Sequence, residues 1–333
     1  MEEMKRLKDF GEAAILQRLQ QFCPAEIIGD DGAILALPPE QSLVVTTDVL
    51  VDGVHFGDRT MPPEKVGWRA VAANLSDLAA MGATPLGITV GLSLPPDTSI
   101  AWLDQLYEGM AACLSRYGTP LVGGDLTRSP VKTIGITAFG TVKPPRTIQR
   151  NAAQVGDVIL VTGCHGDSRA GLELLLNGDH PRAKNLSFAD RQILIHAHQM
   201  PIPRLDVLND LNSLPLRWPI AGMDSSDGLA DAVLQICQAS EVGAVIQAEK
   251  IPISPALQRY QSPEIALQWA LYGGEDFELV LCLPQDTAES LLKKLPGQGA
   301  MVGQITAEKT VAIANGTGQT TPLSQAQTFQ HFA

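Results

Sequence analysis

The sequence contains few of the features that mark several large classes of protein. Only 5 of its 333 residues are cysteines, and no two of them form a C-x-x-C pair. An odd number of widely separated cysteines argues against a disulfide framework and against a zinc site. No apolar run approaches the roughly 18 residues that a membrane-spanning helix needs. We therefore expect no membrane partner and, because the charged first residues do not resemble a signal peptide, a cytoplasmic protein.

Basic residues are also scarce. The chain has 24 Lys and Arg against 36 Asp and Glu, which gives a formal net charge of −12. Nucleic-acid binding requires a basic face, and no basic cluster occurs, so we expect no nucleic-acid partner. An acidic protein can bind an anionic nucleotide only when cations lie between the two. Many aspartates with few basic residues therefore indicate metal-mediated phosphate binding.

Helical and strand patterns alternate along the chain. Apolar spacing of i, i+3, i+4 predicts helices over residues 7–22, 63–81, 99–117, 188–198, 203–211 and 229–239, and one that begins near residue 168. Short apolar runs bounded by Gly, Pro and Asp predict strands over residues 43–47, 54–56, 86–92, 120–122, 133–142, 158–162, 220–223, 244–246, 277–283, 301–305 and 311–313. This order predicts an α/β fold with layers of helix and sheet. The Pro-rich polar segment 143–157 predicts a linker between two domains, residues 1–150 and 151–333.

The sequence does contain a set of short clusters of acids and glycines. They are GDDG at 29–32, TTD at 46–48, NLSD at 74–77, GGD at 123–125, DSSDG at 224–228 and GGED at 273–276. We expect them at strand ends and helix starts. Carboxylates are ligands that Mg²⁺ prefers, and glycines let the main chain approach a phosphate closely. The clusters therefore predict a metal-dependent enzyme that acts on phosphates.

Two clusters in the first half have alternative interpretations. We expect the TTD cluster at the end of a strand, with the side chains of Thr46, Thr47 and Asp48 directed at one spot. The alternative is a helix cap or a turn, which such residues also form. The NLSD cluster places polar groups in an otherwise apolar helix, and buried polar groups need partners. A metal or a phosphate would satisfy Asp77, whereas a capped helix break near Ser76 is the alternative.

The clusters in the second half repeat this arrangement. In DSSDG, Asp224 is expected to bind metal, while Asp227 either does the same or caps the following helix. GGED places two carboxylates side by side, and these repel each other unless a cation or a donor relieves them. A connecting turn is the alternative, but we expect Glu275 to contact a cationic or donor-rich part of a second substrate. His55, close behind Asp48, reaches the same site or is a structural histidine.

In this order, the motifs GDDGAIL, VVTTDVLVDGVHF, AVAANLSDLAAMGATP, GGDLT, DSSDGL and GGEDFEL resemble the thiamine-monophosphate kinase family of the aminoimidazole-ribonucleotide-synthetase-like superfamily. The resemblance covers nearly the whole chain. It implies a two-domain fold whose N-terminal domain binds ATP and Mg²⁺ and forms an intersubunit β-barrel in a homodimer, with the C-terminal domain completing the active site. It also implies ATP-dependent phosphorylation of thiamine monophosphate to thiamine diphosphate with several Mg²⁺ ions.

The resemblance also implies roles for particular residues. The metal ligands would be Asp31, Thr46, Thr47, Asp48, Asp77, Asp125, Asp224 and Asp227. ATP would contact Tyr107, Gly124, Asp125, Arg150 and Ser226, the thiamine phosphate would contact His55, Glu275 and Phe329, and catalysis would depend on Asp48, Asp77 and Asp125. Ser225 and Phe329 depart from the family pattern, which usually has an aliphatic residue and a tyrosine there. These two departures concern the contacts to the thiamine ring.

Other functions would also use such clusters. Phosphoribosylaminoimidazole synthetases, selenophosphate synthetases and hydrogenase-maturation dehydratases share the ATP site of the superfamily and differ in the acceptor. The segment around Cys23 lacks the Gly-rich context of a selenophosphate synthetase cysteine. A metal-dependent phosphohydrolase and a non-catalytic cation-binding scaffold are alternatives from other classes. The glycine-aspartate clusters in both halves of the chain favour the kinase.

Overall fold

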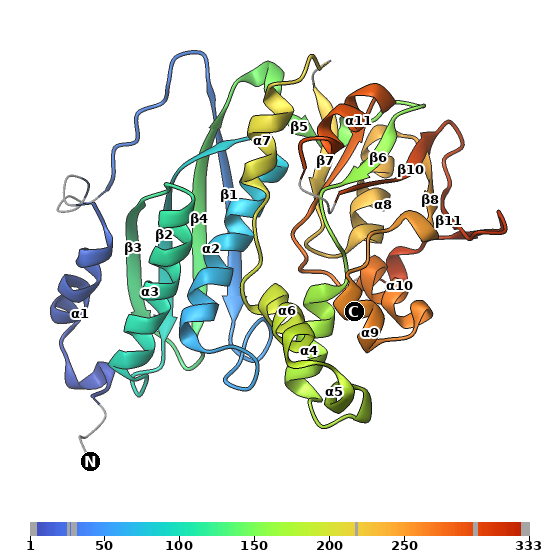
Figure 1. The fold of residues 1–333 in the computed structure, drawn as a ribbon. Coiled ribbons are helices and arrows are strands. Elements are labelled where there is room, and N and C mark those ends of the chain that lie inside the picture. The colour runs from blue at the N-terminus through green and yellow to red at the C-terminus, as the bar shows by residue number, and fades with distance from the viewer. Residues whose placement is uncertain (1–4, 25–26, 28–31, 217–218, 296–298, 328–333) are drawn as a thin grey trace. The chain divides into compact units, whose positions relative to one another are not determined.

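The chain forms two compact units. The computed structural model describes residues 5–24, 27, 32–216, 219–295 and 299–327 (Figure 1). One unit comprises Met1–Leu78 and Ala83–Val142, and the other comprises Ala79–Gly82 and Lys143–Ala333. The division at Val142 falls at the N-terminal edge of the expected linker, residues 143–157. The expected two-domain α/β organisation is confirmed.

The first unit is built on a four-stranded sheet with the order β1-β4-β2-β3. The strands are β1 (Ser42–Val51), β2 (Thr84–Leu94), β3 (Leu121–Arg128) and β4 (Thr133–Val142). Strand β4 pairs antiparallel with both β1 and β2, whereas β2 and β3 are parallel. A parallel pair needs a crossover connection, and the segment that contains helix α3 (Ile100–Arg116) supplies it.

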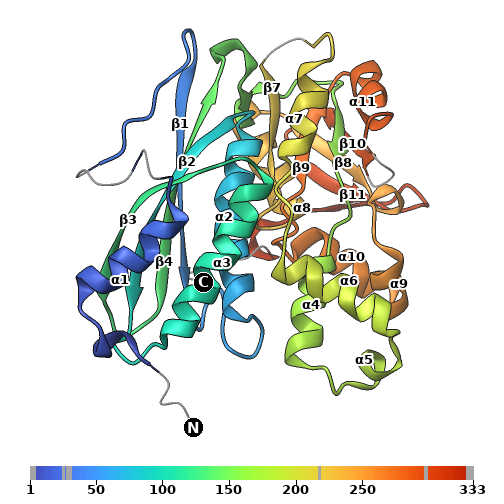
Figure 2. The same cartoon turned by 60° about the vertical axis from the view of Figure 1, so that its left-hand side comes forward.

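Helices α2 (Pro63–Ala80) and α3 lie against one face of this sheet (Figures 1 and 2). Ser99 caps α3, since its hydroxyl accepts the amide of Trp102 at 3.1 Å. The expected helix over residues 7–22 is interrupted. It consists of α1 (Glu12–Leu19) between two 3-10 turns, Leu7–Asp9 and Gln20–Phe22, because the extended Gly11 starts a new helix.

Two glycines allow α2 and α3 to approach closely. A Cβ at Gly109 would overlap the carbonyl oxygen of Glu64, and one at Gly67 would overlap the carbonyl oxygen of Leu106. Glycine inside a helix costs about 1 kcal/mol relative to alanine. The close backbone contact therefore explains why both helices contain glycine at this position.

The second unit contains an eight-stranded mixed sheet with the order β12-β11-β8-β10-β6-β9-β7-β5. Its strands are β5 (Ile148–Gln149), β6 (Val158–Val161), β7 (Ile220–Asp224), β8 (Gly243–Gln247), β9 (Leu279–Leu283), β10 (Ala300–Thr306), β11 (Val311–Ala314) and β12 (Thr320–Pro322). The pairs β5·β7 and β8·β11 are parallel, and the other pairs are antiparallel.

Helices of the second unit lie on both faces of this sheet and in a further core. Helices α8 (Leu229–Ser240) and α10 (Pro263–Tyr272) pack on one face, and α7 (Leu205–Asn212) and α11 (Gln285–Leu292) pack on the other. Helices α4 (Asp167–Leu176), α5 (Pro181–Asn185), α6 (Phe188–Gln199) and α9 (Pro255–Tyr260) pack with one another and with part of α10. Alternate residues of β9 enter different cores: Val280 packs with α8 and α10, whereas Leu281 packs with α7 and α11. A strand buried on both faces reads as a continuous apolar run, as β9 does.

One core of the second unit includes a segment from the first half of the chain. Ala79 and Ala80, the last residues of α2, are buried with Val207, Leu208 and Leu211 of α7. The amide of Ile148 donates to the carbonyl of Met81 at 3.3 Å, which ties the same segment to the start of β5. Residues 79–82 therefore belong to the second unit, although they precede β2.

Most expected elements are confirmed with shifts of one or two residues, but three strands differ. Strand β1 continues to Val51, and β3 continues to Arg128 instead of ending near residue 122. The expected strand at 54–56 is a turn, closed by a bridge between Asp52 and Phe56. The sequence did not predict α5, α9, α10, α11, β5 or β12. No helix within the described ranges combines the length and the apolar character needed to cross a membrane.

The contact of α2 with α3 predicts a specific loss of stability. Changing Gly109→Ala should destabilise the protein by about 1–3 kcal/mol, because the new Cβ overlaps a backbone oxygen that cannot move aside. Unfolding by urea, followed by circular dichroism, measures the change. The control is Ala112→Ser, which adds one atom at an exposed position of the same helix and should cost no more than about 0.5 kcal/mol. Wild-type stability of Gly109→Ala would contradict the predicted overlap.

Candidate functional site

In the first unit, β1 and α2 bring three candidate residues together. Thr46 and Asp48 lie on the face of β1 that meets α2. The Thr46 hydroxyl donates to the Asp77 carboxylate, and the Asp48 amide donates to Asn74 Oδ1 at 3.1 Å. Asn74 Nδ2 in turn donates to the Ala70 carbonyl at 3.0 Å. The polar residues of α2 therefore have partners within the protein, and Thr46, Asp48 and Asp77 form one group, which we call the N-terminal oxygen group.

The position of TTD within its strand differs from the expectation. The three residues lie in the middle of β1, not at its end, because the strand continues to Val51. Successive side chains of a strand point to opposite faces, so Thr47 does not share the direction of Thr46 and Asp48. Its hydroxyl instead lies 2.9 Å from that of Thr137 on β4. The expectation that all three side chains point at one spot is wrong for Thr47.

The GGD cluster also lies inside a strand instead of at its end. Gly123, Gly124 and Asp125 are part of β3, where Asp125 is opposite Gly91 of β2. A Cβ at Gly124 would overlap the carbonyl oxygen of Val90, so this glycine permits the pairing of β2 with β3. Asp125 is exposed.

His55 lies in the turn that follows β1. Its Nδ1 accepts the amide of Val51 at 3.1 Å, so in the neutral ring the proton is on Nε2. The guanidinium of Arg69 donates to the His55 carbonyl, and burial lowers the pKa of Arg69 to about 10. Lys132 forms an ion pair with Asp52 at 2.9 Å on the same turn. His55 is thus held at a defined place.

In the second unit, the DSSDG and GGED segments are bonded to each other. Strand β7 ends at the buried Asp224, and Ser225 exchanges two hydrogen bonds with Glu278. The Ser225 amide donates to the Glu278 carbonyl at 2.9 Å, and the Glu278 amide donates to the Ser225 hydroxyl at 3.2 Å. The Glu275 amide donates to the Ser226 carbonyl at 2.7 Å. We call residues 224–228 and 273–278 the paired loops.

The start of helix α8 contradicts the interpretation of Asp227 as the residue that caps this helix. Gly228, with φ of 103°, is the residue that caps the helix, so Asp227 lies outside it. A Cβ on Gly228 would lie 2.6 Å from the Leu271 carbonyl oxygen. Ser225, which departs from the family pattern, is completely buried and bonded to Glu278. Its hydroxyl therefore serves the pairing of the loops.

The GGEDFE turn is strained, and each of its acids has a donor or a histidine nearby. Glu275 and Phe277 have φ of 62° and 53°, a region that non-glycine residues rarely occupy. The Asp276 carboxylate accepts the amides of Gly166 at 2.7 Å and Ser168 at 3.1 Å, where α4 begins. Burial raises the pKa of Asp276 to about 8. Main-chain donors at the start of α4 therefore hold the Asp276 carboxyl group.

Glu275 contacts a buried histidine. Its Oε2 lies 3.7 Å from Nδ1 of His198 on α6, and the same nitrogen lies 3.2 Å from the Ser168 hydroxyl. His198 is only 3% exposed, whereas the Glu275 side chain retains 32% exposure. The carboxylate of Glu275 is therefore anchored on one side and accessible to a ligand on the other.

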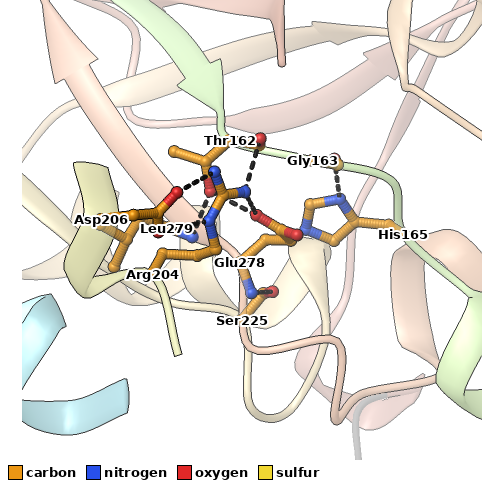
Figure 3. Close-up of polar contacts among 8 residues, drawn as sticks. All are labelled: Thr162, Gly163, His165, Arg204, Asp206, Ser225, Glu278 and Leu279. Atoms are coloured by element: carbon orange, nitrogen blue, oxygen red, sulfur yellow. Dashed lines mark hydrogen bonds and ion pairs between the residues drawn. The ribbon is translucent and has the colours of Figure 1, made fainter. Parts of the chain in front are cut away.

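Glu278 is the centre of a polar network behind the paired loops (Figure 3). Its Oε2 accepts the Thr162 hydroxyl and Nη1 of Arg204. Burial raises the pKa of the Glu278 carboxyl, and the charge of Arg204 opposes this shift. His165 lies beside the network, and its Nδ1 is 3.1 Å from the Gly163 carbonyl. Burial lowers the pKa of His165 to about 4, so the ring is neutral at pH 7 and Nδ1 carries its proton.

Of the remaining candidate residues, the structure describes two and leaves two outside its described ranges. Tyr107 is buried on α3, with its ring centroid 5.4 Å from that of Phe22. Arg150 is exposed and donates to Gln235 at 2.7 Å. Asp31 and Phe329 lie outside the described residues. The sequence motifs did not point to Arg204, His165 or His198, because these residues lie far from the acid and glycine clusters along the chain. The Pro-Ile-Pro-Arg sequence before α7 is the only local signal for Arg204.

The donor chemistry of the candidates fits a hard cation. Hydroxyls and carboxylates are all oxygen ligands, as Mg²⁺ requires. The Thr46 hydroxyl contacts the Asp77 carboxylate, and Asp48 lies two residues further along the same face of β1. Within each unit, no three His, Cys, Asp or Glu side chains of the described residues gather as a metal site. A cation at this place would therefore take further oxygens from hydroxyls, main chain, water or substrate.

Sequence comparison places the chain among known proteins. Residues 29–142 match the family described as AIR synthase related protein, N-terminal domain, and residues 154–314 match the corresponding C-terminal domain. The thiamine-monophosphate kinase of Synechococcus elongatus is 54% identical over 331 residues, which covers 98% of each chain. That of Escherichia coli K12 is 41% identical over 288 residues, which covers 84% of each chain.

Solved structures agree with this relationship. The thiamine-monophosphate kinase of Stenotrophomonas maltophilia has a TM-score of 0.81 at 33% identity, covering 94% of this chain and 98% of that one. The complex of AaThiL with AMPPCP and TMP has a TM-score of 0.76 at 31% identity, covering 98% and 99%. The hydrogenase maturation protein HypE in complex with ATP, at 20% identity and a TM-score of 0.75, shares the fold. The chain therefore belongs to the thiamine-monophosphate kinase family, within the AIR synthase related proteins.

Proposed function

We propose that the chain transfers the γ-phosphoryl group of ATP to thiamine monophosphate, which yields thiamine diphosphate and ADP. An oxygen of the acceptor phosphate forms a bond to the γ-phosphorus, the bond from that phosphorus to the bridging oxygen breaks, and the electron pair leaves with ADP. The observation that carries this proposal is the N-terminal oxygen group in a chain that matches thiamine-monophosphate kinases over 98% of its length. The AaThiL complex with AMPPCP and TMP supports it.

The reaction needs no general base. The nucleophile is a phosphomonoester with a second pKa near 6, so roughly 90% of it is dianionic at pH 7. Positioning and charge neutralisation then carry the catalysis. This agrees with the chemistry of the N-terminal oxygen group, which contains carboxylates and a hydroxyl but no histidine.

Charge is the main obstacle for this reaction. Two unit charges 5 Å apart repel by about 3 kcal/mol at an effective dielectric of 20, and ATP and the acceptor bring several such pairs together. The protein adds its own net charge of −12. Bound Mg²⁺ would neutralise the phosphates and stabilise the charge that develops during transfer. We propose that several such ions are held by the carboxylates of the chain.

The proposed roles follow from these requirements. Asp48, Asp77 and Asp125 would be catalytic through the metal ions that they bind. The further metal ligands would be Asp31, Thr46, Asp224 and Asp227, with ATP contacts from Tyr107, Gly124, Asp125, Arg150 and Ser226. Thr47, whose hydroxyl lies on the other face of β1 beside Thr137, would contribute only its main-chain oxygen. His55, Glu275 and Phe329 would contact thiamine monophosphate, and the partial exposure of Glu275 beside His198 supports its role.

A direct assay tests the substrate. Purified protein with ATP and Mg²⁺ should form thiamine diphosphate from thiamine monophosphate but not from thiamine, because the acceptor must already contain a phosphate oxygen. Chromatography of the thiamine products measures this. Consumption of ATP with neither acceptor altered would contradict the proposal and favour a sister synthetase or a hydrolase. No consumption of ATP with any metal would favour a cation-binding scaffold.

Removal of either carboxylate of the N-terminal oxygen group tests the metal role. Asp48→Asn and Asp77→Asn should each lower kcat by about 100-fold or more at saturating Mg²⁺ and leave the circular dichroism spectrum unchanged. The loss follows because an amide is a much weaker ligand than a carboxylate for a hard cation. Asp97→Asn is the control, since it removes only the exposed ion pairs with Arg6 and Lys8. Full activity of either variant would exclude its carboxylate from the reaction.

We also propose that the chain forms a homodimer through the sheet of the first unit, with the two sheets joined into a barrel. Helices α2 and α3 cover one face of that sheet, whereas β1 presents apolar residues on the other. Leu43, Val45 and Val49 are 46%, 53% and 49% exposed, and strand alternation places all three on that face. Three large exposed apolar side chains on one face of a strand, interrupted only by Thr47, are typical of an interface.

A charge on this face should separate the subunits. Val45→Asp should shift the protein from dimer to monomer in sedimentation equilibrium, because the interface would have to bury an unpaired carboxylate. Val131→Asp introduces the same charge at another exposed valine of the first unit, 43% exposed in the turn before β4, and should leave the dimer intact. A wild-type protein that is monomeric at micromolar concentration would overturn the proposed dimer.

A further inference from the structure

Arg204 contacts Thr162, Asp206 and Glu278, although no sequence motif points to it (Figure 3). Its Nη1 donates to the Thr162 carbonyl at 2.7 Å and also to the Glu278 carboxylate. Its Nε and Nη2 donate to the two carboxylate oxygens of Asp206, at 3.0 and 3.1 Å. The planar fork of a guanidinium can serve both carboxylates at once, which a lysine ammonium cannot do with the same geometry. The side chain is 9% exposed.

Glu278 transmits this anchoring to the paired loops. Its carboxylate is bonded to Arg204 and Thr162, and its main chain is bonded to Ser225 in both directions. A Cβ at Gly163 would overlap the Glu278 carboxylate, so the end of β6 packs directly against it. The position of Ser225 is therefore fixed by the same residue that Arg204 holds.

Residues that bind ligands under the proposed function lie next to Ser225 or are bonded to its neighbours. Ser225 is flanked by Asp224 and Ser226, and the Ser226 carbonyl accepts the amide of Glu275. Glu275 has a φ of 62°, which persists only where surrounding contacts enforce it. A loosened Glu278 would therefore release both loops together.

We propose that Arg204 is a positioning residue for the reaction: it holds Glu278 and, through Ser225, keeps the paired loops in the conformation that presents Asp224, Ser226 and Glu275 to their ligands. This rests on the proposed function for the identity of those ligands. The anchoring of the loops is a property of the protein alone, and it is measurable without any ligand.

The test compares two arginine-to-lysine changes by hydrogen exchange. Arg204→Lys retains the charge beside Glu278 but loses the fork. We expect amide exchange in peptides covering residues 222–228 and 273–279 to become about 10-fold faster or more, with no change in the strand at residues 243–247. Arg259→Lys is the matched control, because Arg259 also grips one carboxylate, Asp190, with two donors. It should leave the exchange of both loops unchanged.

Kinetics then test the link to the reaction. With Arg204→Lys, kcat/KM for thiamine monophosphate should fall about 10-fold at a temperature well below unfolding, whereas Arg259→Lys should match the wild type. Exchange that rises equally throughout the second unit, or loop exchange that rises without any kinetic change, would mean a purely structural role and overturn the proposal. A wild-type protein without kinase activity would refute the proposed function, while the exchange experiment would still decide on the anchoring.

A second variant decides the outcome if Arg204→Lys does not fold. Asp206→Asn weakens one of the two carboxylate contacts of the guanidinium, because an amide offers a single oxygen and no charge, and so it loosens Arg204 beside Glu278. The Asp206 side chain is 57% exposed, so the change should not prevent folding. Faster exchange limited to the paired loops would support the proposal, and wild-type exchange there would overturn it.

Discussion

Burial of carboxyl groups is the constraint around which the paired loops of the second unit are organised. Glu275, Asp276 and Glu278 lie within four residues of one another, and each contacts a different element. His198 of α6 contacts Glu275, and the amides at the start of α4 donate to Asp276. Arg204 and Thr162 donate to Glu278. The strained turn exists because these partners fix it from three directions. This acidic protein thus uses internal donors for the acids that it buries in the paired loops.

The sequence predicted the layered two-domain fold, because apolar periodicity marks helices such as α2 and α8 reliably. It failed for the ends of β1 and β3. Both strands continue through residues that are rare in strands, Asp48 in one and Gly123, Gly124 and Asp125 in the other. Pairing with neighbouring strands outweighs this local preference, and Gly124 is required there by the nearness of Val90. Tertiary contacts of this kind cannot be read from a window of neighbouring residues.

The sequence pointed to the candidate acids but not to the residues that hold them in place. Asp48 and Asp77 were expected to act together, and the structure places them in one group through Thr46 and Asn74. The partners of the buried acids were not foreseen. Arg204 lies 74 residues before Glu278, and His198 lies on a helix chosen only for its periodicity. A motif records which residues meet a ligand, whereas the residues that hold them are selected by packing and are scattered along the chain.

The placement of Ala79 and Ala80 has a consequence for the architecture as a whole. These residues close α2, yet they fill a core of the second unit beside Val207 and Leu211. A gene fragment that begins at Lys143 would encode every strand of the eight-stranded sheet and still lack part of its core. The two units therefore cannot be exchanged between relatives by a single crossover at the linker. Recombination that preserves the core of the second unit would have to transfer the coding sequence for residues 79–82 together with that for residues 143–333.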